Sequence, residues 1–181
     1  MTIREQIQSE AQLQALDPDV VLALVMVESG QNPWAWNPEP KYRYLWNVKT
    51  KAPFRAITAA EGAAEFPPVD FPTIGGDRDQ EWWGQQASWG LMQVMGAVAR
   101  ERGFKGIYLP ELVNPAVNLA IGCAHLASLV AWAKGDVPQA LAAFNGGKGG
   151  NGARPFRNAE YSEKVMKTKL RISRTPTGGH A

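Results

Sequence analysis

Apolar and polar residues alternate along this chain with the spacing of helices, and glycine or proline separates one periodic segment from the next. Thr2 and Glu5 have the spacing of a capping box and predict a first helix near the amino terminus. A second helix is expected from Asp19 to Ser29, because Asp17–Pro18 supplies a capping side chain and a proline suited to the first helical position. Gly30 is expected to end this second helix.

Four further periodic segments follow a long interruption. The most apolar of them begins at Asn114–Pro115, runs to about Lys134 and is hydrophobic on nearly all sides, which is typical of a central, buried helix. Asp136 and Gln139 have capping-box spacing before a shorter helix that is expected to end at Phe144. The other two segments span residues 91–102 and 158–171. A mainly helical chain is therefore expected.

The long interruption, residues 31–87, is rich in proline, glycine and aromatic residues and has no clear period. An irregular segment of this length inside a compact domain is uncommon and often functional. Six of the seven tryptophans lie between Trp34 and Trp89, and their flat apolar faces suit stacking on sugar rings. The same side chains would also anchor an irregular loop. No convincing strand pattern is present, but the segment has room for a short hairpin.

Composition bounds the class of protein. With 181 residues, 45% of them hydrophobic and 20% charged, the chain has the size and balance of one globular domain. The longest unbroken apolar run, Val20–Val27, has eight residues, well below the roughly 20 that cross a bilayer. No membrane insertion is expected. A net charge of +2 gives no reason to expect a nucleic acid partner, and we expect a monomer with a disordered tail over residues 175–181.

Cysteine and histidine usage gives no indication of a metal site. Cys123 is the only cysteine, which excludes an internal disulfide, and its apolar neighbours indicate a core position. The two histidines, His125 and His180, form no recognisable metal-ligand spacing with it. The glycine-rich residues 146–152 lack the Lys-Ser/Thr of a phosphate-binding loop. No metal and no cofactor are expected.

Glu28 is the first residue that suggests chemistry. Positions three, four and seven before it are Val25, Leu24 and Val21, so the helix face that carries this carboxylate is apolar. Loss of solvation and the negative end of the helix dipole both raise the pKa of a carboxyl group, which favours the protonated form that a glycosidic general acid requires. The local pattern is equally consistent with an exposed glutamate at a helix end.

Several short motifs occur in order from Glu28 onward, most of them at the ends of expected helices. The motifs are Glu28-Ser29-Gly30, Asn32-Pro33, Gly90-Leu91-Met92-Gln93-Val94-Met95, Asn114-Pro115-Ala116-Val117-Asn118-Leu119-Ala120-Ile121-Gly122, Ala142-Ala143-Phe144-Asn145-Gly146-Gly147 and Glu160-Tyr161. The ordered set resembles the soluble lytic transglycosylase family, the SLT domain of glycoside hydrolase family 23, which is related to goose-type lysozyme. The resemblance covers Asp17 to Val165 except for the insertion, and it implies a mainly α, lysozyme-like single domain over residues 1–174.

The resemblance implies a role for each matching residue. Glu28 would protonate the glycosidic oxygen between N-acetylmuramic acid and N-acetylglucosamine of peptidoglycan. It would then take the proton of the muramic C6 hydroxyl, which leaves a 1,6-anhydro end without a second carboxylate. Tyr161 matches a tyrosine that hydrogen-bonds the catalytic glutamate, and Phe144 stands where most members have tyrosine, so one hydroxyl is missing. Other residues expected to bind substrate are Gln93, Met95, Asn145 and Ser88, the last near the place of a loop serine.

The insertion leaves alternatives open. We expect Trp82 and Trp83 to extend one wall of the glycan groove. One of Asp70, Asp77, Asp79 or Glu81 would instead make the protein an inverting muramidase if it held a water opposite Glu28, with the two carboxyl groups roughly 6.5–9.5 Å apart. A non-catalytic glycan-binding module and a vestigial domain in a structural protein, such as part of a phage tail, are further alternatives.

The two ends of the chain suggest where the protein acts. The amino terminus lacks the apolar stretch of a secretory signal. Together with the small size, this favours a bacteriophage or prophage protein acting on the cell wall, either an endolysin released into the periplasm or a virion-associated enzyme. A bacterial protein without its leader would have the same features. A solvated helix end or attraction to an anionic cell wall would explain the basic residues Lys164, Lys167, Lys169, Arg171 and Arg174.

Overall fold

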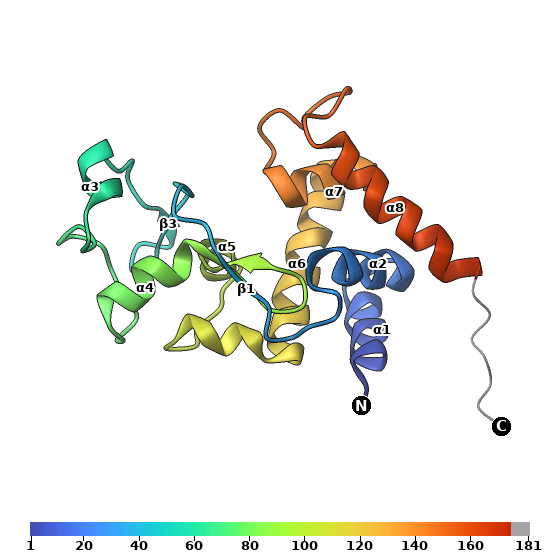
Figure 1. The fold of residues 1–181 in the computed structure, drawn as a ribbon, viewed down its shortest axis with the longest axis horizontal. Coiled ribbons are helices and arrows are strands. Elements are labelled where there is room, and N and C mark those ends of the chain that lie inside the picture. Colours follow the sequence, from blue (N-terminus) through green and yellow to red (C-terminus); the bar gives the residue numbers. More distant parts are fainter. Residues whose placement is uncertain (175–181) are drawn as a thin grey trace. The chain divides into compact units, whose positions relative to one another are not determined.

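The computed structural model describes residues 1–174, so the expected disordered tail lies outside the described residues. The chain is mainly helical (Figure 1), which confirms the predicted fold class. It divides into two compact units, one made of residues 1–31 with the chain from 123 onward and the other of residues 32–122. Helix α6, Pro115–Trp132, belongs to the second unit up to Gly122 and to the first from Cys123.

The first unit is built around α2, which spans Pro18–Ser29 (Figure 1). The Asp17 side chain caps its start, and Gly30 ends it in the left-handed conformation with a φ of 60°, where a side chain would be strained. Residues 20–25 are at most 7% exposed, so α2 forms the core of this unit. Helices α1 (Ile3–Leu13) and α8 (Ala159–Arg174) pack against α2, and α7 (Val137–Gly146) packs against α8.

The predicted capping signals have different outcomes. The Thr2–Glu5 capping box is confirmed, with Thr2 Oγ1 accepting from the Glu5 N–H and the Glu5 carboxylate accepting from the Thr2 N–H. The Asp136 side chain caps α7 by accepting from the Gln139 N–H, as predicted. The other half of the predicted capping box is wrong, because the Gln139 side chain does not accept from the Asp136 N–H. Gln139 Nε2 instead donates to the carbonyl oxygens of Asn151 (3.0 Å) and Gly152 (2.8 Å). This side chain joins the start of α7 to the loop that follows it.

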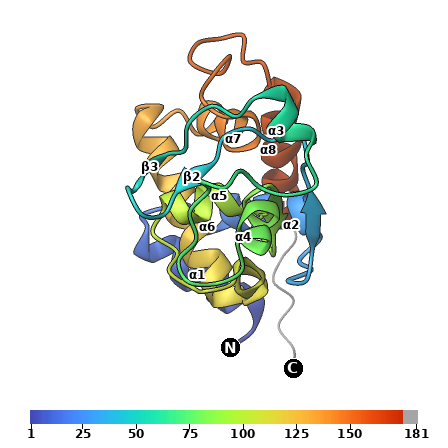
Figure 2. The same ribbon diagram turned by 90° about the vertical axis from the view of Figure 1, so that its left-hand side faces the viewer.

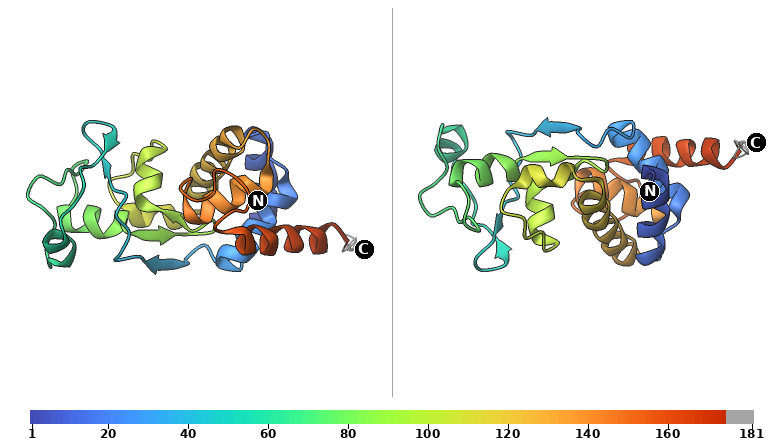
Figure 3. Two further views of the ribbon diagram at one scale, coloured as in Figure 1. Left: turned by 90° about the horizontal axis from the view of Figure 1, so that it is seen from above. Right: turned by 90° about the horizontal axis from the view of Figure 1, so that it is seen from below.

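The second unit contains short strands that the sequence pattern did not predict. Strands β1, β4 and β5 form an antiparallel sheet in that order, with Trp36 opposite Trp89 and Ser88 opposite Met95. The blue arrow of β1 lies beside the green arrow of β4 in both views of Figure 3. Strands of two or three residues are too short to show an alternating pattern. The elements of this unit are β1 (Trp36–Pro38), β2 (Trp46–Asn47), β3 (Ala52–Pro53), α3 (Ala59–Ala63), α4 (Arg78–Gln85), β4 (Ala87–Trp89), β5 (Val94–Met95), α5 (Gly96–Glu101) and the 3-10 helix η1 (Leu109–Val113).

The periodic segment 91–102 is helical only from Gly96. A tight turn precedes it, in which Gly90 and Gln93 have φ values of 68° and 46°. Val94 and Met95 then pair with β4 as the short strand β5. Turn and strand formation override the helical period over the first half of this segment because they give its backbone other hydrogen-bond partners.

The insertion has its own small core, although most of it is irregular. Leu45, Phe71 and Trp82 are at most 2% exposed, and Phe54 and Ile57 pack against them. The Phe71 and Trp82 rings meet edge to face with centroids 5.0 Å apart, as preferred by aromatic pairs. The segment does contain a short hairpin, β2–β3, which α3 and then α4 follow in the chain (Figure 2). Trp82 is therefore a core residue.

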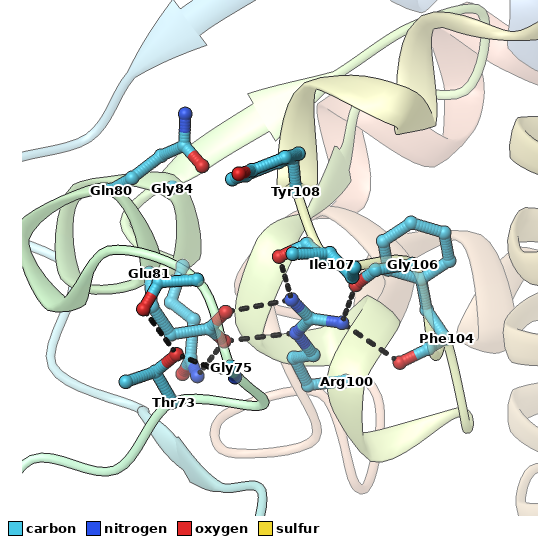
Figure 4. A network of polar contacts seen from close by, with 12 residues as sticks. Thr73, Gly75, Gln80, Glu81, Gly84, Arg100, Phe104, Gly106, Ile107 and Tyr108 are labelled. Atoms are coloured by element: carbon cyan, nitrogen blue, oxygen red, sulfur yellow. Dashed lines mark hydrogen bonds and ion pairs between the residues drawn. The ribbon is translucent and has the colours of Figure 1, made fainter.

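A buried ion pair joins α4 to α5 (Figure 4). Arg100 donates from Nη2 and Nε to the two carboxylate oxygens of Glu81, at 2.6 and 2.9 Å. Arg100 Nη1 also donates to the carbonyl oxygens of Phe104 and Gly106, and Gln85 Nε2 donates to Glu81. Both ions are buried, so these additional bonds are needed to offset the cost of removing the charges from water. Glu81 is a structural residue of this unit.

Helix α6 is long and apolar enough to cross a membrane by length and composition, with a mean hydropathy of 1.4 over 18 residues. Polar residues interrupt its apolar ones, so the helix contains no long unbroken apolar run. One third of the helix is buried within the protein. This buried share is smaller than the sequence analysis predicted for a central, buried helix. Core helices of many proteins are equally long and apolar, so this helix is only weak evidence for a membrane span.

Candidate active site

Glu28 lies in the last turn of α2 and is partly buried. Val21, Leu24 and Val25, which share its side of the helix, have no exposed surface. Loss of solvation raises the pKa of the Glu28 carboxyl group above its usual value, as the sequence pattern predicted. The group therefore favours the protonated form, which is the form a general acid needs.

Tyr161, in the first turn of α8, donates its hydroxyl hydrogen to Glu28 Oε1. This bond and the charge of Lys164 lower the pKa of Glu28 and so oppose the larger effect of burial. Burial and the neighbouring Glu28 raise the pKa of the Tyr161 phenol, which keeps its proton and remains a donor. The pair orients one carboxyl group and balances its two protonation states, so that it can both give and take a proton.

The end of α7, in the same unit, holds two more of the expected site residues. The Phe144 ring packs against the His125 ring of α6, with centroids 5.3 Å apart. Asn145 is exposed, and its Oδ1 accepts a hydrogen bond of 2.7 Å from Asn158 Nδ2. Phe144 thus has a packing partner where the expected tyrosine hydroxyl is missing, and Asn145 is oriented by the next helix.

Asn151 and Asn158 are residues that the sequence analysis missed. Asn151 is fully buried, and its Nδ2 donates to the carbonyl oxygens of Ala142 and Gly147 at 3.3 and 2.8 Å. Its Oδ1 accepts from the Asn158 N–H at 3.0 Å. These bonds hold the glycine-rich loop to the end of α7 and the start of α8. Asn-Gly at 151–152 is a turn signal in the sequence, but it does not indicate which carbonyl groups the side chain will meet.

In the second unit the structure brings Gln93 and Ser88 together. Ser88 Oγ donates to Gln93 Oε1 at 2.9 Å, and Gln93 Nε2 donates to the carbonyl oxygens of Ala35 (3.1 Å) and Gly90 (2.9 Å). Ser88 is 7% exposed, while Gln93 and Met95 are partly buried. The Gln93 amide therefore has a fixed orientation, with both its oxygen and its nitrogen held.

Asn118, a residue of α6, holds this turn in place. In the sequence it stood out only as one member of the Asn114–Gly122 motif. It is fully buried, accepts from the Met92 N–H at 2.8 Å, and donates to the carbonyl oxygens of Trp89 and Leu112 at 2.8 and 3.0 Å. A Cβ at Gly90 would lie 2.6 Å from Asn118 Nδ2. Glycine is therefore required there both for the positive φ and for this close approach.

The tryptophans divide into buried and exposed residues, which corrects one expectation. Trp82 is 1% exposed and has no free face for stacking on a sugar. Its neighbour Trp83 is 45% exposed, and Trp34 and Trp36 are 74% and 57% exposed. The exposed tryptophan rings of this unit are thus Trp34, Trp36 and Trp83.

Three of the four insertion carboxylates that are candidates for holding a water have structural partners. Asp70 forms a 2.7 Å ion pair with Arg55, Asp77 caps α4, and Glu81 pairs with Arg100. The Arg55 guanidinium lowers the pKa of Asp70, so this carboxyl group stays ionised in its pair. Asp79, in the first turn of α4, is the remaining candidate for holding a water.

Metal chemistry has no candidate site in the part of the chain that the structure describes. Residues 1–174 contain no group of three His, Cys, Asp or Glu side chains placed to hold an ion. Cys123 is buried, and burial raises the pKa of its thiol to about 12, so the thiol stays neutral and packs as a core residue.

The chain is thus a mainly helical, lysozyme-like domain with a partly buried, tyrosine-bonded carboxyl group at a helix end. The Transglycosylase SLT domain family matches residues 5–166 of this chain. The chain belongs to that family, whose members cleave the glycan strands of peptidoglycan in the manner of lytic transglycosylases. Its substrate is peptidoglycan and it acts on the cell wall. A search of curated proteins finds no match.

Proposed function

We propose that Glu28 is the single catalytic acid and base of a lytic transglycosylase that cleaves the β-1,4 bond between N-acetylmuramic acid and N-acetylglucosamine. The observation that carries the proposal is the Glu28 carboxyl group, partly buried on an apolar helix face and hydrogen-bonded by Tyr161. Burial favours the protonated acid, while Tyr161 and Lys164 stabilise the carboxylate. Both forms are needed in one catalytic cycle.

In the proposed reaction, protonated Glu28 gives its proton to the glycosidic oxygen as the bond to the muramic anomeric carbon breaks. The resulting carboxylate takes the proton of the muramic C6 hydroxyl, whose oxygen bonds to the same carbon. This closes the 1,6-anhydro ring and returns Glu28 to its protonated form. No water is consumed, because the nucleophile belongs to the substrate.

The insertion carboxylates favour this reaction over hydrolysis. An inverting muramidase needs a second carboxylate that holds a water. Asp70 and Glu81 are in ion pairs and Asp77 is a helix cap, so a role as base would require each to leave its partner. Of the four carboxylates considered for the hydrolytic alternative, this leaves Asp79.

The remaining site residues are proposed to contact the sugar. Gln93 lies in the turn that Asn118 holds, and Met95 follows this turn in β5. The Ser88 hydroxyl orients the Gln93 amide. Asn145 presents its amide at the exposed end of α7, and Phe144 contributes an apolar surface. An origin in a phage or prophage stays a prediction, as does the monomeric state.

Products formed in H₂¹⁸O should distinguish the two reactions. We expect muropeptides with 1,6-anhydromuramic ends, one water lighter than hydrolysis products and without ¹⁸O. Mass spectrometry of the released fragments measures both properties, and a hydrolytic muramidase run in parallel shows that the label can be incorporated. Reducing ends that contain ¹⁸O would show a hydrolase, and Asp79→Asn would then be the variant to test.

Removing the Tyr161 hydroxyl is expected to lower kcat about tenfold, since a hydrogen bond to a charged group contributes on the order of 1.5 kcal/mol. The bond lowers the pKa of Glu28, so Tyr161→Phe should raise it. The alkaline limb of the kcat/KM profile reports loss of the proton from the acid and should move to higher pH. Rates of glycan cleavage measured across pH test both effects.

Tyr44→Phe is the matched control for Tyr161→Phe. It removes a similar bond, 3.0 Å from the Tyr44 hydroxyl to Glu101 Oε2, in the other unit. Its pH profile should equal that of the unaltered protein. An alkaline limb that stays in place in Tyr161→Phe would show that Tyr161 does not act on Glu28.

A further inference from the structure

The second unit contains a hollow of about 530 Å³ that the proposed cleavage does not use. Its apolar lining comes from the turn at Pro33–Trp34, from Val113 at the end of η1, and from Pro115 and Val117 in the first turn of α6. None of the residues that line it is among those proposed to act on the sugar at Glu28. The volume is typical of sites that bind small ligands.

Trp34 is the largest side chain of this hollow and is 74% exposed. Its backbone is fixed in a turn, because the Trp34 N–H donates to Asn32 Oδ1 at 3.0 Å. The Ala35 N–H closes the turn by donating to the Asn32 carbonyl oxygen at 3.3 Å. An indole ring presented from a fixed turn offers a flat apolar face to a ligand, and little freedom is lost when the ligand binds.

Two polar side chains line the same hollow, and in each of them one atom is already held by the backbone. Asn114 Oδ1 accepts from the N–H groups of Ala116 and Val117, at 3.0 and 3.3 Å. Glu111 Oε1 accepts from the Tyr108 N–H at 2.9 Å. Within residues 1–174, Asn114 Nδ2 and Glu111 Oε2 have no protein partner. The hollow therefore has one oriented donor and one oriented acceptor for a ligand.

A neutral sugar is the ligand that this lining fits best. Glu111 is the only charged residue among the described residues of the lining, so an anion such as a peptide carboxylate would be repelled. A pyranose ring packs its C–H face on an indole, and its hydroxyl and acetamido groups donate and accept hydrogen bonds. Strands of N-acetylated sugars are also the polymer that members of this family cleave.

We propose that this hollow is an accessory glycan-binding site, in which Trp34 stacks on an N-acetylated sugar while Asn114 and Glu111 hydrogen-bond its polar groups. The site holds a glycan strand in addition to the strand being cleaved, and so keeps the enzyme on the cell wall between cleavage events. Two sites on one chain raise the affinity for a polymer of many identical sugars, but not for a fragment too short to reach both. The proposal goes beyond the role of Glu28 and does not depend on it.

The test compares insoluble cell-wall sacculi with a soluble peptidoglycan tetrasaccharide. For Trp34→Ala we expect the dissociation constant for sacculi, measured by co-sedimentation in the cold, to rise about tenfold, which corresponds to about 1.4 kcal/mol. The kcat/KM on sacculi should fall by a similar factor, whereas cleavage of the tetrasaccharide should be unchanged. Because Trp34 is exposed, the thermal unfolding midpoint should also be unchanged.

Three further variants test the assignment. Trp34→Tyr keeps an aromatic ring and should recover most of the binding. Asn114→Asp keeps an oxygen that can cap α6 but replaces the donor with an acceptor, so it should weaken binding to sacculi without unfolding the helix. Phe66→Ala is the matched control, since Phe66 is a 62% exposed aromatic residue of the same unit that does not line the hollow. It should bind sacculi as the unaltered protein does.

Sacculi from which an amidase has removed the stem peptides identify the ligand. The difference between Trp34→Ala and the unaltered protein should be the same on these stripped sacculi. It should also persist as salt is raised, because no ion pair is involved. A difference that disappears on stripped sacculi would show a peptide ligand and overturn the proposal.

Equal losses of cleavage on sacculi and on the tetrasaccharide would overturn the proposal as well, because Trp34 would then belong to the cleaving site. Unchanged binding of sacculi by Trp34→Ala would also overturn it. Analytical ultracentrifugation that shows a dimer dissociated by Trp34→Ala would assign the hollow to a second copy of the chain instead. Failure of the proposed function is distinguishable from all of these results, since it would appear as cleavage that persists when Glu28 is replaced.

Discussion

Glu28→Gln is expected to lower the rate of glycan cleavage about a thousandfold, within the range that general acid–base groups contribute. Glutamine has nearly the same shape but cannot donate the proton that the leaving oxygen needs. Its amide oxygen can still accept the Tyr161 hydroxyl bond, so the fold should be retained. The measurements are muropeptide release and the thermal unfolding midpoint of the same preparation.

The matched control is Glu10→Gln, the same change in the same unit. Glu10 is partly buried on α1 and accepts a long bond of 3.5 Å from Gln14. This variant should keep full activity. Undiminished wall cleavage by Glu28→Gln would refute the catalytic role, whereas loss of both activity and folded structure would require Glu28→Asp, which keeps an acid but moves it. That variant should fold and still be impaired.

Trp82→Ala is expected to cost about 3–5 kcal/mol of the free energy of unfolding, the usual range for removing a buried tryptophan. The ring is 1% exposed and packs edge to face on Phe71 in the small core of the insertion. Urea denaturation followed by tryptophan fluorescence and circular dichroism measures the loss.

Trp83→Ala provides the comparison within the same helix. Trp83 is 45% exposed and touches Trp82 only at an edge, with centroids 6.5 Å apart. It should cost less than about 1.5 kcal/mol, the value of one aromatic pair, and any loss of glycan binding should appear here. Equal destabilisation by the two variants would contradict the assignment of Trp82 to the core.

These two residues show where reasoning from sequence ends. Trp82 and Trp83 are adjacent in α4, so their side chains point about 100° apart. One of them must face inward, but the helix is only eight residues long and has no regular apolar stripe. Which one is buried depends on where Leu45 and Phe71 pack, and those residues come from distant parts of an irregular segment.

The turn before α5 shows the same limit for backbone structure. The spacing of apolar residues over 91–102 is helical, yet Gly90 and Gln93 adopt positive φ values and Val94–Met95 form a strand. The partners that stabilise this arrangement are β4 and the buried Asn118 of α6, 26 residues from Met92. No local pattern contains that information.

The sequence by itself determined the helices and their caps around Glu28, because capping and periodicity act over three to seven neighbouring residues. It also determined the apolar face that raises the pKa of Glu28 and the ordered motifs of the SLT family. The family motifs predicted the bond between Tyr161 and Glu28, which joins residues 133 positions apart, and the structure contains it. The tertiary structure alone decided that the charge of Lys164 acts on the same carboxyl group. It also decided that Glu81 is used in an ion pair with Arg100. These are long-range contacts, and a chain specifies them only by packing.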